Sequence, residues 1–266
     1  TEGVKGSGSP TPNPYPLPWV GSGVEGALAQ LRGRERARYV ARMFSRITSR
    51  YDRMNTVMSA GRHYAWRRMA VDVAVGGLTG PALDVAAGTG DFAIELARRE
   101  PVTEVVAADF SREMLEAAAR KSSRQGLSSR IDYAVADAHA LPFSDHRFIC
   151  ATVGFGVRNF TDLPGALAEM ARVVVPGGRV VVLEIVRAAG GPVGRLFPLY
   201  FKYATPWLGA VLAGDREAYT YLPESVQGFL SVDELSAAMH AAGLRNVTAR
   251  NLALGTVAIL SAEVPP

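Results

Sequence analysis

The stretch that decides the fold reads Leu83-Asp84-Val85-Ala86-Ala87-Gly88-Thr89-Gly90-Asp91. An apolar strand runs into a turn of small residues, and a helix begins directly after that turn. Small residues let such a turn pass close to a ligand, and the first N–H groups of the helix are free to bind it. The stretch therefore predicts a strand, a ligand-binding loop and a helix, which is the repeating unit of an open α/β sheet.

The same alternation of strand and helix continues along the chain. Strands are predicted at 82–86, 104–109, 131–136, 148–153 and 179–185, with helices that end near residue 99, span 111–125, and begin at Leu163 behind the N-cap Asp162. Strands that alternate with helices in this way form a parallel sheet with right-handed crossovers and helices on both faces.

The C-terminal part has a different pattern. Ser231-Val232-Asp233-Glu234 is a capping box that opens a helix, and this helix stops at Gly243. Two β-rich runs follow at 246–252 and 256–262, separated by a short turn. They predict a terminal hairpin, so that one antiparallel strand joins a seven-stranded and otherwise parallel sheet.

The pattern divides the chain into five parts. Residues 1–23 are a flexible tail rich in Gly, Pro and Ser, 24–80 an N-terminal helical cap, 81–189 the cofactor-binding core, 190–230 an apolar lid or insertion, and 231–266 the C-terminal helix and hairpin. Apolar residues at helical spacing between 197 and 212 are interrupted by Pro206, which makes this segment too short to span a bilayer. It is either a core-covering helix or a lid with an apolar outer surface.

Composition narrows the class of protein. The 266 residues carry a net charge of +4, and the basic residues are mostly scattered singly, so a nucleic-acid partner is not expected. The basic residues either lie on a solvated helix face or attract the protein to an anionic membrane surface. The single cysteine, Cys150, is predicted to be a buried apolar residue, and four histidines without paired spacing predict no metal site. We expect a cytoplasmic protein, with peripheral contact at the inner face of the membrane as an option.

The acidic residues around the glycine loop indicate which cofactor it binds. Gly88, Gly90 and Ala93 match the dinucleotide pattern G-x-G-x-x-A, which by itself is ambiguous. However, Asp84 and Asp91 flank the glycines, and carboxylates there repel a pyrophosphate but suit a sulfonium and an α-amino group. S-adenosylmethionine is therefore favoured over NAD.

Two further carboxylates lie at predicted strand ends. Asp109 can accept hydrogen bonds from both ribose hydroxyls, or else it caps the helix that follows. Asp137, beside Ala138, can hold the amino group of adenine, or else it only forms a turn. Together with Asp84, these residues predict a binding site for S-adenosylmethionine along one edge of the sheet.

A second block follows the apolar run at 148–153 and reads Gly154-Phe155-Gly156-Val157-Arg158-Asn159-Phe160-Thr161-Asp162. Two glycines and an Arg-Asn pair occupy the end of a buried strand, where open α/β sheets bind their ligands. Folding alone rarely requires this combination. The block is therefore the candidate for the acceptor side of the site.

With these residues in view, the chain resembles the ubiquinone/menaquinone biosynthesis C-methyltransferase family from about residue 44 to residue 260. The motifs that carry the resemblance are Phe44-Ser45-Arg46-Ile47, Tyr51-Asp52-Arg53-Met54-Asn55, Ser59-Ala60-Gly61-Arg62-His63, Trp66-Arg67, the loop 87–91, the block 154–162, and Tyr219-Thr220-Tyr221-Leu222-Pro223-Glu224-Ser225. Gly154 stands where the family often has Ser. The blocks at 155–162 and 221–225 are specific to the family.

The resemblance implies a class I, Rossmann-like fold and transfer of a methyl group from S-adenosylmethionine to a ring carbon of a prenylated quinol. It implies that Thr89, Asp109 and the Asp137-Ala138 pair contact the cofactor. The predicted cofactor site is completed by its neighbours in the same loops, namely Asp84, Ala86, Gly88, Gly90, Phe110 and Gly154.

A ring carbon becomes nucleophilic when an adjacent phenol loses its proton, so the acceptor must be the reduced quinol. Arg158 is the candidate to stabilise the phenolate, because its guanidinium stays charged and offers a planar fork to an oxygen. Asn159 would orient Arg158 or the substrate oxygen. The alternative for Arg158 is an ion pair with Asp162 that only orders the loop.

Two residues of the cap are further candidates. His63 could be a general base, since its unperturbed pKa lies near neutrality, or it could be a structural histidine. Tyr51, with Tyr221, could close over the sulfonium through cation–π attraction, or it could pack as an ordinary aromatic residue.

The sequence leaves several questions open. The acceptor is either demethylmenaquinol, which we favour, or the benzoquinol of the ubiquinone pathway, and C- or O-methylation of another small aromatic or isoprenoid acceptor is an alternative. Two more remote hypotheses are an NAD-dependent oxidoreductase and a non-catalytic protein that senses S-adenosylmethionine. The length of the prenyl tail and the oligomeric state, including a homodimer, are also open.

Overall fold

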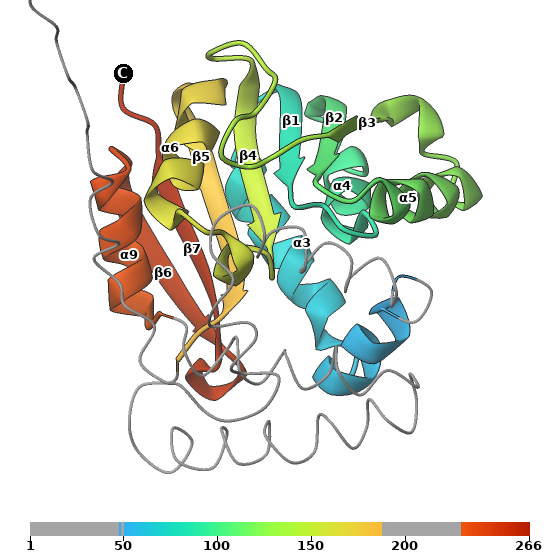
Figure 1. The fold of residues 1–266 in the computed structure, drawn as a ribbon, viewed down its shortest axis with the longest axis horizontal. Helices are drawn as coiled ribbons and strands as arrows, with labels where there is room; N and C mark the ends of the chain where they lie inside the picture. Colours follow the sequence, from blue (N-terminus) through green and yellow to red (C-terminus); the bar gives the residue numbers. More distant parts are fainter. Residues whose placement is uncertain (1–47, 49–50, 188–229) are drawn as a thin grey trace, which may run out of the picture.

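This computed structural model describes residue 48, residues 51–187 and residues 230–266. Seven strands form one sheet: β1 (Gly80–Val85), β2 (Val102–Asp109), β3 (Ile131–Val135), β4 (Phe148–Gly154), β5 (Val174–Ile185), β6 (Arg245–Leu252) and β7 (Val257–Glu263). Their order across the sheet is β3-β2-β1-β4-β5-β7-β6 (Figure 1). This order confirms the predicted class I methyltransferase topology.

The directions of the strands also match the prediction. Strands β1 to β5 pair in parallel, whereas β7 runs antiparallel to both β5 and β6. The chain order reverses between the neighbours β1 and β4. Loops that follow these two strands must diverge there, which opens a crevice at the carboxyl edge of the sheet.

Five α-helices cover the sheet in the described parts of the chain: α3 (Arg62–Val75), α4 (Asp91–Ala97), α5 (Arg112–Arg124), α6 (Leu163–Val173) and α9 (Val232–Ala241). Residues 51–59 of the cap are helical as well. Short 3-10 turns stand at η1 (Ser128–Arg130), η2 (Val157–Asn159) and η3 (Ala253–Gly255). Asp162 caps α6, and Ser231 with Glu234 forms the capping box of α9, as predicted. Ser111, predicted as the first residue of its helix, is instead the N-cap of α5.

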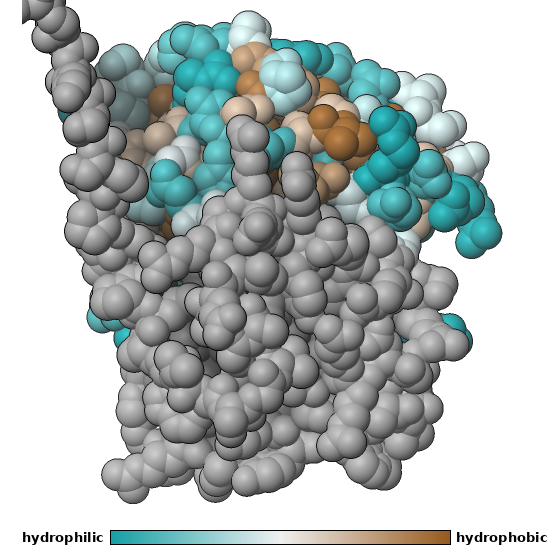
Figure 2. All heavy atoms as spheres, viewed as in Figure 1, coloured by the Kyte–Doolittle hydropathy of each residue, from teal (hydrophilic) through white to brown (hydrophobic). Residues whose placement is uncertain are grey.

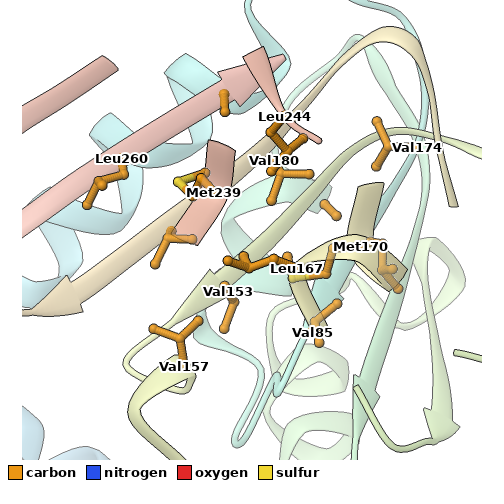
Figure 3. Close-up of a cluster of buried hydrophobic side chains, with 14 of the residues drawn as sticks. Val85, Val153, Val157, Leu167, Met170, Val174, Val180, Met239, Leu244 and Leu260 are labelled. Atoms are coloured by element: carbon orange, nitrogen blue, oxygen red, sulfur yellow. The ribbon is translucent and has the colours of Figure 1, made fainter. Parts of the chain in front are cut away.

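Each face of the sheet has its own hydrophobic cluster, because successive strand residues point to opposite faces. Leu167 and Met170 of α6 and Met239 of α9 pack on Val85, Val153 and Val180 of the sheet (Figure 3). On the other face, residues of α3, α4 and α5 pack on Ala82, Val105, Cys150 and Val181. The sheet is thus buried on both sides, which explains the continuous apolar runs of β4 and β5.

Some predicted element ends differ from those of the structure. Strand β5 begins at Val174 rather than at residue 179, because Val174 pairs with Phe148 before a register shift through Pro176, Gly177 and Gly178. The first core helix ends at Ala97 rather than near residue 99. The tail at 1–23, the segment 190–230 apart from Leu230, and most of the cap before residue 51 lie outside the described residues.

Cys150 is buried, as predicted, and burial raises the pKa of its thiol to about 12. Such a thiol stays protonated and unreactive at neutral pH.

The described surface visible in Figure 2 is mostly hydrophilic, with hydrophobic residues in small separate groups. In the described part of the chain no helix has both the length and the apolar character that crossing a membrane requires.

Candidate cofactor and acceptor site

A cavity opens at the carboxyl edge of the sheet, where the loops after β1, β2, β3 and β4 meet. Its lining includes seven of the predicted cofactor residues, namely Ala86, Gly88, Asp109, Phe110, Asp137, Ala138 and Gly154. Tyr51 and Asn159, predicted to act on the acceptor side, line it as well. A smaller polar hollow adjoins the cavity and contains Asp84 and Thr89. The structure thus brings together residues spread over more than 100 positions.

The glycine loop owes its shape to left-handed backbone. Ala86, Gly88 and Gly90 have φ angles of 53°, 55° and 80°, values that glycine adopts readily and alanine rarely. At Gly90 a Cβ atom would lie 2.8 Å from the Cβ of Ala118 in α5, whereas at Gly88 it would meet open space. Gly90 is therefore needed for close packing of α5, and it lines neither space among the described residues.

Asp109 is oriented toward the cavity by two backbone donors. Its Oδ2 accepts a hydrogen bond of 2.7 Å from Gly88 N, and its Oδ1 accepts one of 2.8 Å from Ser111 N. Burial raises the pKa of Asp109 even though both N–H groups favour the carboxylate. Each carboxylate oxygen can accept a second hydrogen bond. Asp109 therefore orders the glycine loop and can still accept hydrogen bonds from a ribose.

Asp84 is fully buried beneath the loop. Its two oxygens accept hydrogen bonds from Ala93 N of α4 at 3.0 Å and from Thr152 Oγ1 of β4 at 3.1 Å. Burial is the main cause that raises the pKa of Asp84 to about 7. These contacts tie the first turn of α4 to the sheet. A direct contact between Asp84 and the cofactor stays a prediction.

Thr89 faces the helical segment 51–59 of the cap. Its hydroxyl donates a hydrogen bond of 2.6 Å to Asp52 Oδ1 and accepts one of 3.2 Å from Lys121 Nζ. Lys121 also forms ion pairs with Asp52 and, at 2.8 Å, with Asp91. The predicted contact of Thr89 with the cofactor stays a prediction, and Asp52 and Lys121 are polar neighbours that the sequence did not single out.

The other end of the cavity contains a histidine that the sequence reasoning missed. His139 donates from its Nδ1 to Asp137 Oδ1 at 2.6 Å, and its Nε2 accepts from Asp162 N at 3.2 Å, which assigns the neutral tautomer. The Asp137 turn closes in addition through His139 N at 3.0 Å. His139 thereby connects the loop after β3 with the loop after β4.

The acceptor block 154–162 wraps against the glycine loop. Phe155 has a φ of 59°, an uncommon value for an aromatic residue, and it turns the chain sharply after β4. A Cβ atom on Gly156 would lie 2.9 Å from the Cβ of Ala86, and one on Gly154 would lie 2.6 Å from the ring of Phe92. Both glycines are therefore required for the close approach of the two loops, and Asn159 follows them into the cavity.

Arg158 does not form the ion pair with Asp162 that was the alternative to its catalytic role. Its Nη1 lies 2.6 Å from Glu184 Oε1 and donates to Phe155 O at 2.6 Å, while Asp162 instead caps α6. The side chains of Arg158 and Glu184 are 3% and 0% exposed, and Arg158 does not line the cavity among the described residues. Its contact with the acceptor oxygen stays a prediction. The sequence signal for Glu184 is a lone acidic residue in the apolar strand β5.

His63 lies inside the structure rather than in the cavity. Its Nδ1 accepts from Arg67 Nη1 at 2.5 Å, and its Nε2 lies 3.2 Å from Thr56 Oγ1. Burial, with the nearby Arg67 charge, lowers the pKa of His63 to about 4. Such a histidine is a weak base at neutral pH. These contacts favour the structural alternative, and its role as a general base stays a prediction.

The chemistry of the lining fits S-adenosylmethionine. Asp109 offers carboxylate oxygens to a ribose, Asp137 stands at the next strand end, and Phe110 and Leu141 give an apolar surface suited to a flat purine ring. Of the two carboxyl groups predicted to repel a pyrophosphate, Asp91 is paired with Lys121 and Arg67 and Asp84 is buried, so the charge of the glycine loop alone does not select the cofactor. No cluster of metal-ligating side chains occurs in the described residues.

Comparison with known proteins agrees with this geometry. The chain matches the ubiE/COQ5 methyltransferase family over residues 32–263. It is 45% identical to a demethylmenaquinone methyltransferase of Thermus thermophilus, over 84% of this chain and 100% of that protein. It is 37% identical to the ubiquinone/menaquinone biosynthesis C-methyltransferase UbiE of Dinoroseobacter shibae, over 87% of this chain and 92% of that protein.

A solved structure supports the fold. An S-adenosylmethionine-dependent methyltransferase from Thermotoga maritima superposes with a TM-score of 0.56 at 19% identity, covering 84% of this chain and 98% of that one. The match over nearly the whole chain, together with the cofactor cavity, selects methyl transfer over the NAD alternative. The chain therefore belongs to the ubiE/COQ5 methyltransferase family and is an S-adenosylmethionine-dependent methyltransferase.

Proposed function

We propose that this enzyme methylates a ring carbon of demethylmenaquinol, the reduced prenylated naphthoquinone, to give menaquinol. The observation that carries the proposal is the 45% identity to the demethylmenaquinone methyltransferase of Thermus thermophilus over that protein's whole length. The meeting of the glycine loop with the acceptor block at one cavity supports it. A benzoquinol acceptor is the competing outcome.

Bound S-adenosylmethionine supplies a methyl group that is electrophilic because it is attached to a sulfonium. The acceptor would attack this methyl group through a ring carbon once the neighbouring hydroxyl has lost its proton. S-adenosylhomocysteine would leave, and the ring carbon would then lose its own hydrogen as a proton to restore the aromatic ring. The protein must therefore hold the acceptor oxygen, stabilise its negative charge and keep bulk water from the site.

We assign the contact with the acceptor oxygen to Asn159, whose position in the cavity lining supports it. An amide can donate a hydrogen bond to a phenolate and thereby fix which ring carbon faces the cofactor. Arg158, directly before it, stays our candidate for the positive charge. Its ion pair with Glu184 holds the guanidinium at the base of the acceptor loop.

Tyr51 is proposed to cover the cofactor from the side of the cap. Its place in the lining of both the cavity and the adjoining hollow supports this role. An aromatic face near a sulfonium contributes about 0.5 to 2 kcal/mol of cation–π attraction, depending on how far water is excluded. The ring also shields the transferring methyl group from water.

We further propose that the enzyme takes its acceptor from the membrane surface, since a prenylated quinol resides in lipid. The net charge of +4 supports attraction to anionic lipid. Charged substitutions at Phe201 and Trp207 should weaken flotation with anionic liposomes, and unchanged flotation would count against this proposal.

Light scattering after size-exclusion chromatography measures the mass of the protein in solution and thereby tests the predicted homodimer.

Lipid mass spectrometry of a complemented strain tests the acceptor. The host should make both menaquinone and ubiquinone and lack its own quinone C-methyltransferase. Expression of this chain is expected to restore menaquinone and deplete demethylmenaquinone. Restoration of ubiquinone alone would move the assignment to the benzoquinol, and restoration of neither in cells shown by immunoblot to contain the folded chain would reject a quinol acceptor.

A further inference from the structure

Lys121 is placed unusually for a lysine near the end of a helix that is otherwise rich in exposed basic residues. Its side chain is only 22% exposed, and its Nζ contacts Asp91 at 2.8 Å, Thr89 Oγ1 at 3.2 Å and the carboxylate of Asp52. Although burial alone lowers the pKa of Lys121, the charges of Asp91 and Asp52 raise it above its ordinary value. The ammonium therefore stays charged and connects three parts of the molecule.

Asp52 is the opposite end of this contact. Its Oδ1 accepts from Thr89 Oγ1 at 2.6 Å, so its carboxylate lies on the glycine loop as well as on Lys121. Its carbonyl oxygen accepts from Thr56 Oγ1 at 2.8 Å, and Thr56 in turn lies 3.2 Å from His63 Nε2. The helical segment 51–59 is thus fixed to the core at Asp52 and to α3 through Thr56.

Tyr51 precedes Asp52 directly and lines both the cofactor cavity and the polar hollow. The contacts of Asp52 therefore fix the backbone from which the Tyr51 side chain reaches the cavity. Resting on the role proposed above for Tyr51, we infer that Lys121 and Asp52 are positioning residues for the cofactor: their ion pair on the glycine loop holds Tyr51 over bound S-adenosylmethionine.

The electrostatics explain why the ion pair can act as a latch. Asp52 and Asp91 are both close to Lys121, so removing the ammonium leaves two carboxylates that repel each other. Asp91 retains Arg67, whose Nη1 lies 3.8 Å away, and it stays on the core. Asp52 then loses its strongest attraction and releases Tyr51. Asp52 lies 37 positions from Thr89 in the sequence and further still from Lys121. The ion pair is therefore a tertiary contact and not part of the glycine motif.

Titration calorimetry with S-adenosylmethionine, which carries the sulfonium that Tyr51 is proposed to cover and is not consumed without an acceptor, tests the inference. The variants are Lys121→Met, which keeps the apolar stem, Asp52→Asn, and both together. We expect each single variant to bind about tenfold more weakly and the double variant to bind no more weakly than either, because both remove one interaction. Arg120→Met, the loss of an exposed charge at the adjacent position of the same helix, is the matched control and should bind within about twofold of the unchanged protein.

Tyr51 must be the residue through which the latch acts. The Tyr51→Ala substitution should weaken binding by itself, and it should add little in the Lys121→Met background. Lys121→Arg, which keeps the charge, should recover most of the affinity. Hydrogen exchange of residues 51–59 should slow on binding in the unchanged protein and slow less in Lys121→Met.

A merely structural ion pair predicts a different result. It would lower the melting temperature of Lys121→Met and Asp52→Asn while their dissociation constants stay unchanged. Unchanged affinity in the folded variants, or losses that add independently in the double variant, would overturn the inference. If Lys121→Met does not fold, the more exposed Asp52→Asn and the pair Asp52→Asn with Tyr51→Ala give the same test.

Discussion

Two carboxyl groups, those of Asp84 and Glu184, are almost completely buried at the carboxyl edge of the sheet. Burial raises the pKa of both, and each accepts a hydrogen bond from a backbone N–H beside the cavity, Asp84 from Ala93 of α4 and Glu184 from Arg158 of η2. Buried charges are costly unless they are paired. Because burying these two carboxyl groups costs stability, we infer that their role is to hold the backbone around the cavity in place rather than to stabilise the fold.

The pKa of Asp84 predicts how stability changes with pH. Its value is 3.8 ordinarily and about 7 in the folded protein, so between these values the folded state keeps a proton that the unfolded state has lost. This contribution to stability is complete below pH 3.8 and falls as pH rises toward 7, by at most about 1.4 kcal/mol per pH unit. Asp84→Asn should therefore gain melting temperature relative to the unchanged protein as pH rises from 5 to 8.

Thermal unfolding at several pH values measures this difference. Asp72→Asn, which changes a carboxylate with a 64% exposed side chain, is the control and should give a nearly constant difference. A difference for Asp84→Asn that is independent of pH would contradict the raised pKa. Asn can keep the hydrogen bond from Ala93, so the variant is expected to fold.

Arg158→Ala is expected to lower the rate of methyl transfer by at least about 100-fold, the usual effect of removing a group that stabilises an oxyanion. Affinity for S-adenosylhomocysteine should stay within a few-fold. The variant also leaves Glu184 buried without its cation, which costs about 3 to 5 kcal/mol. Arg158→Gln with Glu184→Gln removes both charges and should recover stability but not turnover. Normal turnover in this double variant would remove Arg158 from the mechanism.

At the residue scale, the sequence predicted those site residues that can be recognised from their own position along the chain. Asp84, Asp109 and Asp137 were identifiable because each lies at a predicted strand end. Glu184, His139, Asp52 and Lys121 were not singled out, because their importance depends on partners from other elements. Arg158 was recognised, but its partner Glu184 belongs to the neighbouring strand, and only the pairing of β4 with β5 brings them together.

At the scale of elements, the contact between α4 and β4 decides how close the two ligand loops can be. Phe92 of α4 lies against Gly154, where a Cβ atom would approach its ring to 2.6 Å. Gly154 has an ordinary φ angle, so the requirement is steric and not conformational. The serine that the family resemblance leads us to expect at this position would clash with the ring of Phe92.

Gly154→Ser is accordingly expected to destabilise the protein by about 1 to 3 kcal/mol, the usual cost of overpacking. Phe92→Leu alone should also destabilise, because it opens a cavity. Combined, the two changes should cost less than their sum, since leucine leaves room for the serine. Urea denaturation midpoints of the four proteins measure the coupling, and strictly additive costs would contradict the contact.

Periodicity and capping residues predicted the existence and order of the described elements. The capping box at Ser231 and the N-cap at Asp162 were predicted correctly because cap chemistry is local. The start of β5 was not, since Pro176 and two glycines resemble a turn, and only pairing with β4 shows that Val174 already belongs to the sheet. Element ends that depend on a neighbouring strand cannot be found from one segment alone.

At the scale of the whole molecule, the strand order places both ligand loops at the switch point between β1 and β4. The family match, together with the lining of the cavity between these loops, identifies S-adenosylmethionine as the cofactor. S-adenosylhomocysteine at about 100 times its dissociation constant should stabilise the folded protein by about 2.7 kcal/mol. NADH at the same concentration should leave the melting temperature unchanged, and an equal shift with NADH would contradict the assignment of the loop.

The central claim is methyl transfer to a reduced prenylated quinol, and product mass spectrometry tests it most directly. The purified enzyme is incubated with S-adenosylmethionine carrying a trideuterated methyl group and with demethylmenaquinol kept reduced. We predict menaquinol that has gained the three deuterium atoms on a ring carbon, together with an equal amount of S-adenosylhomocysteine. Absence of labelled menaquinol under these conditions, or a label on oxygen instead of carbon, would contradict the account.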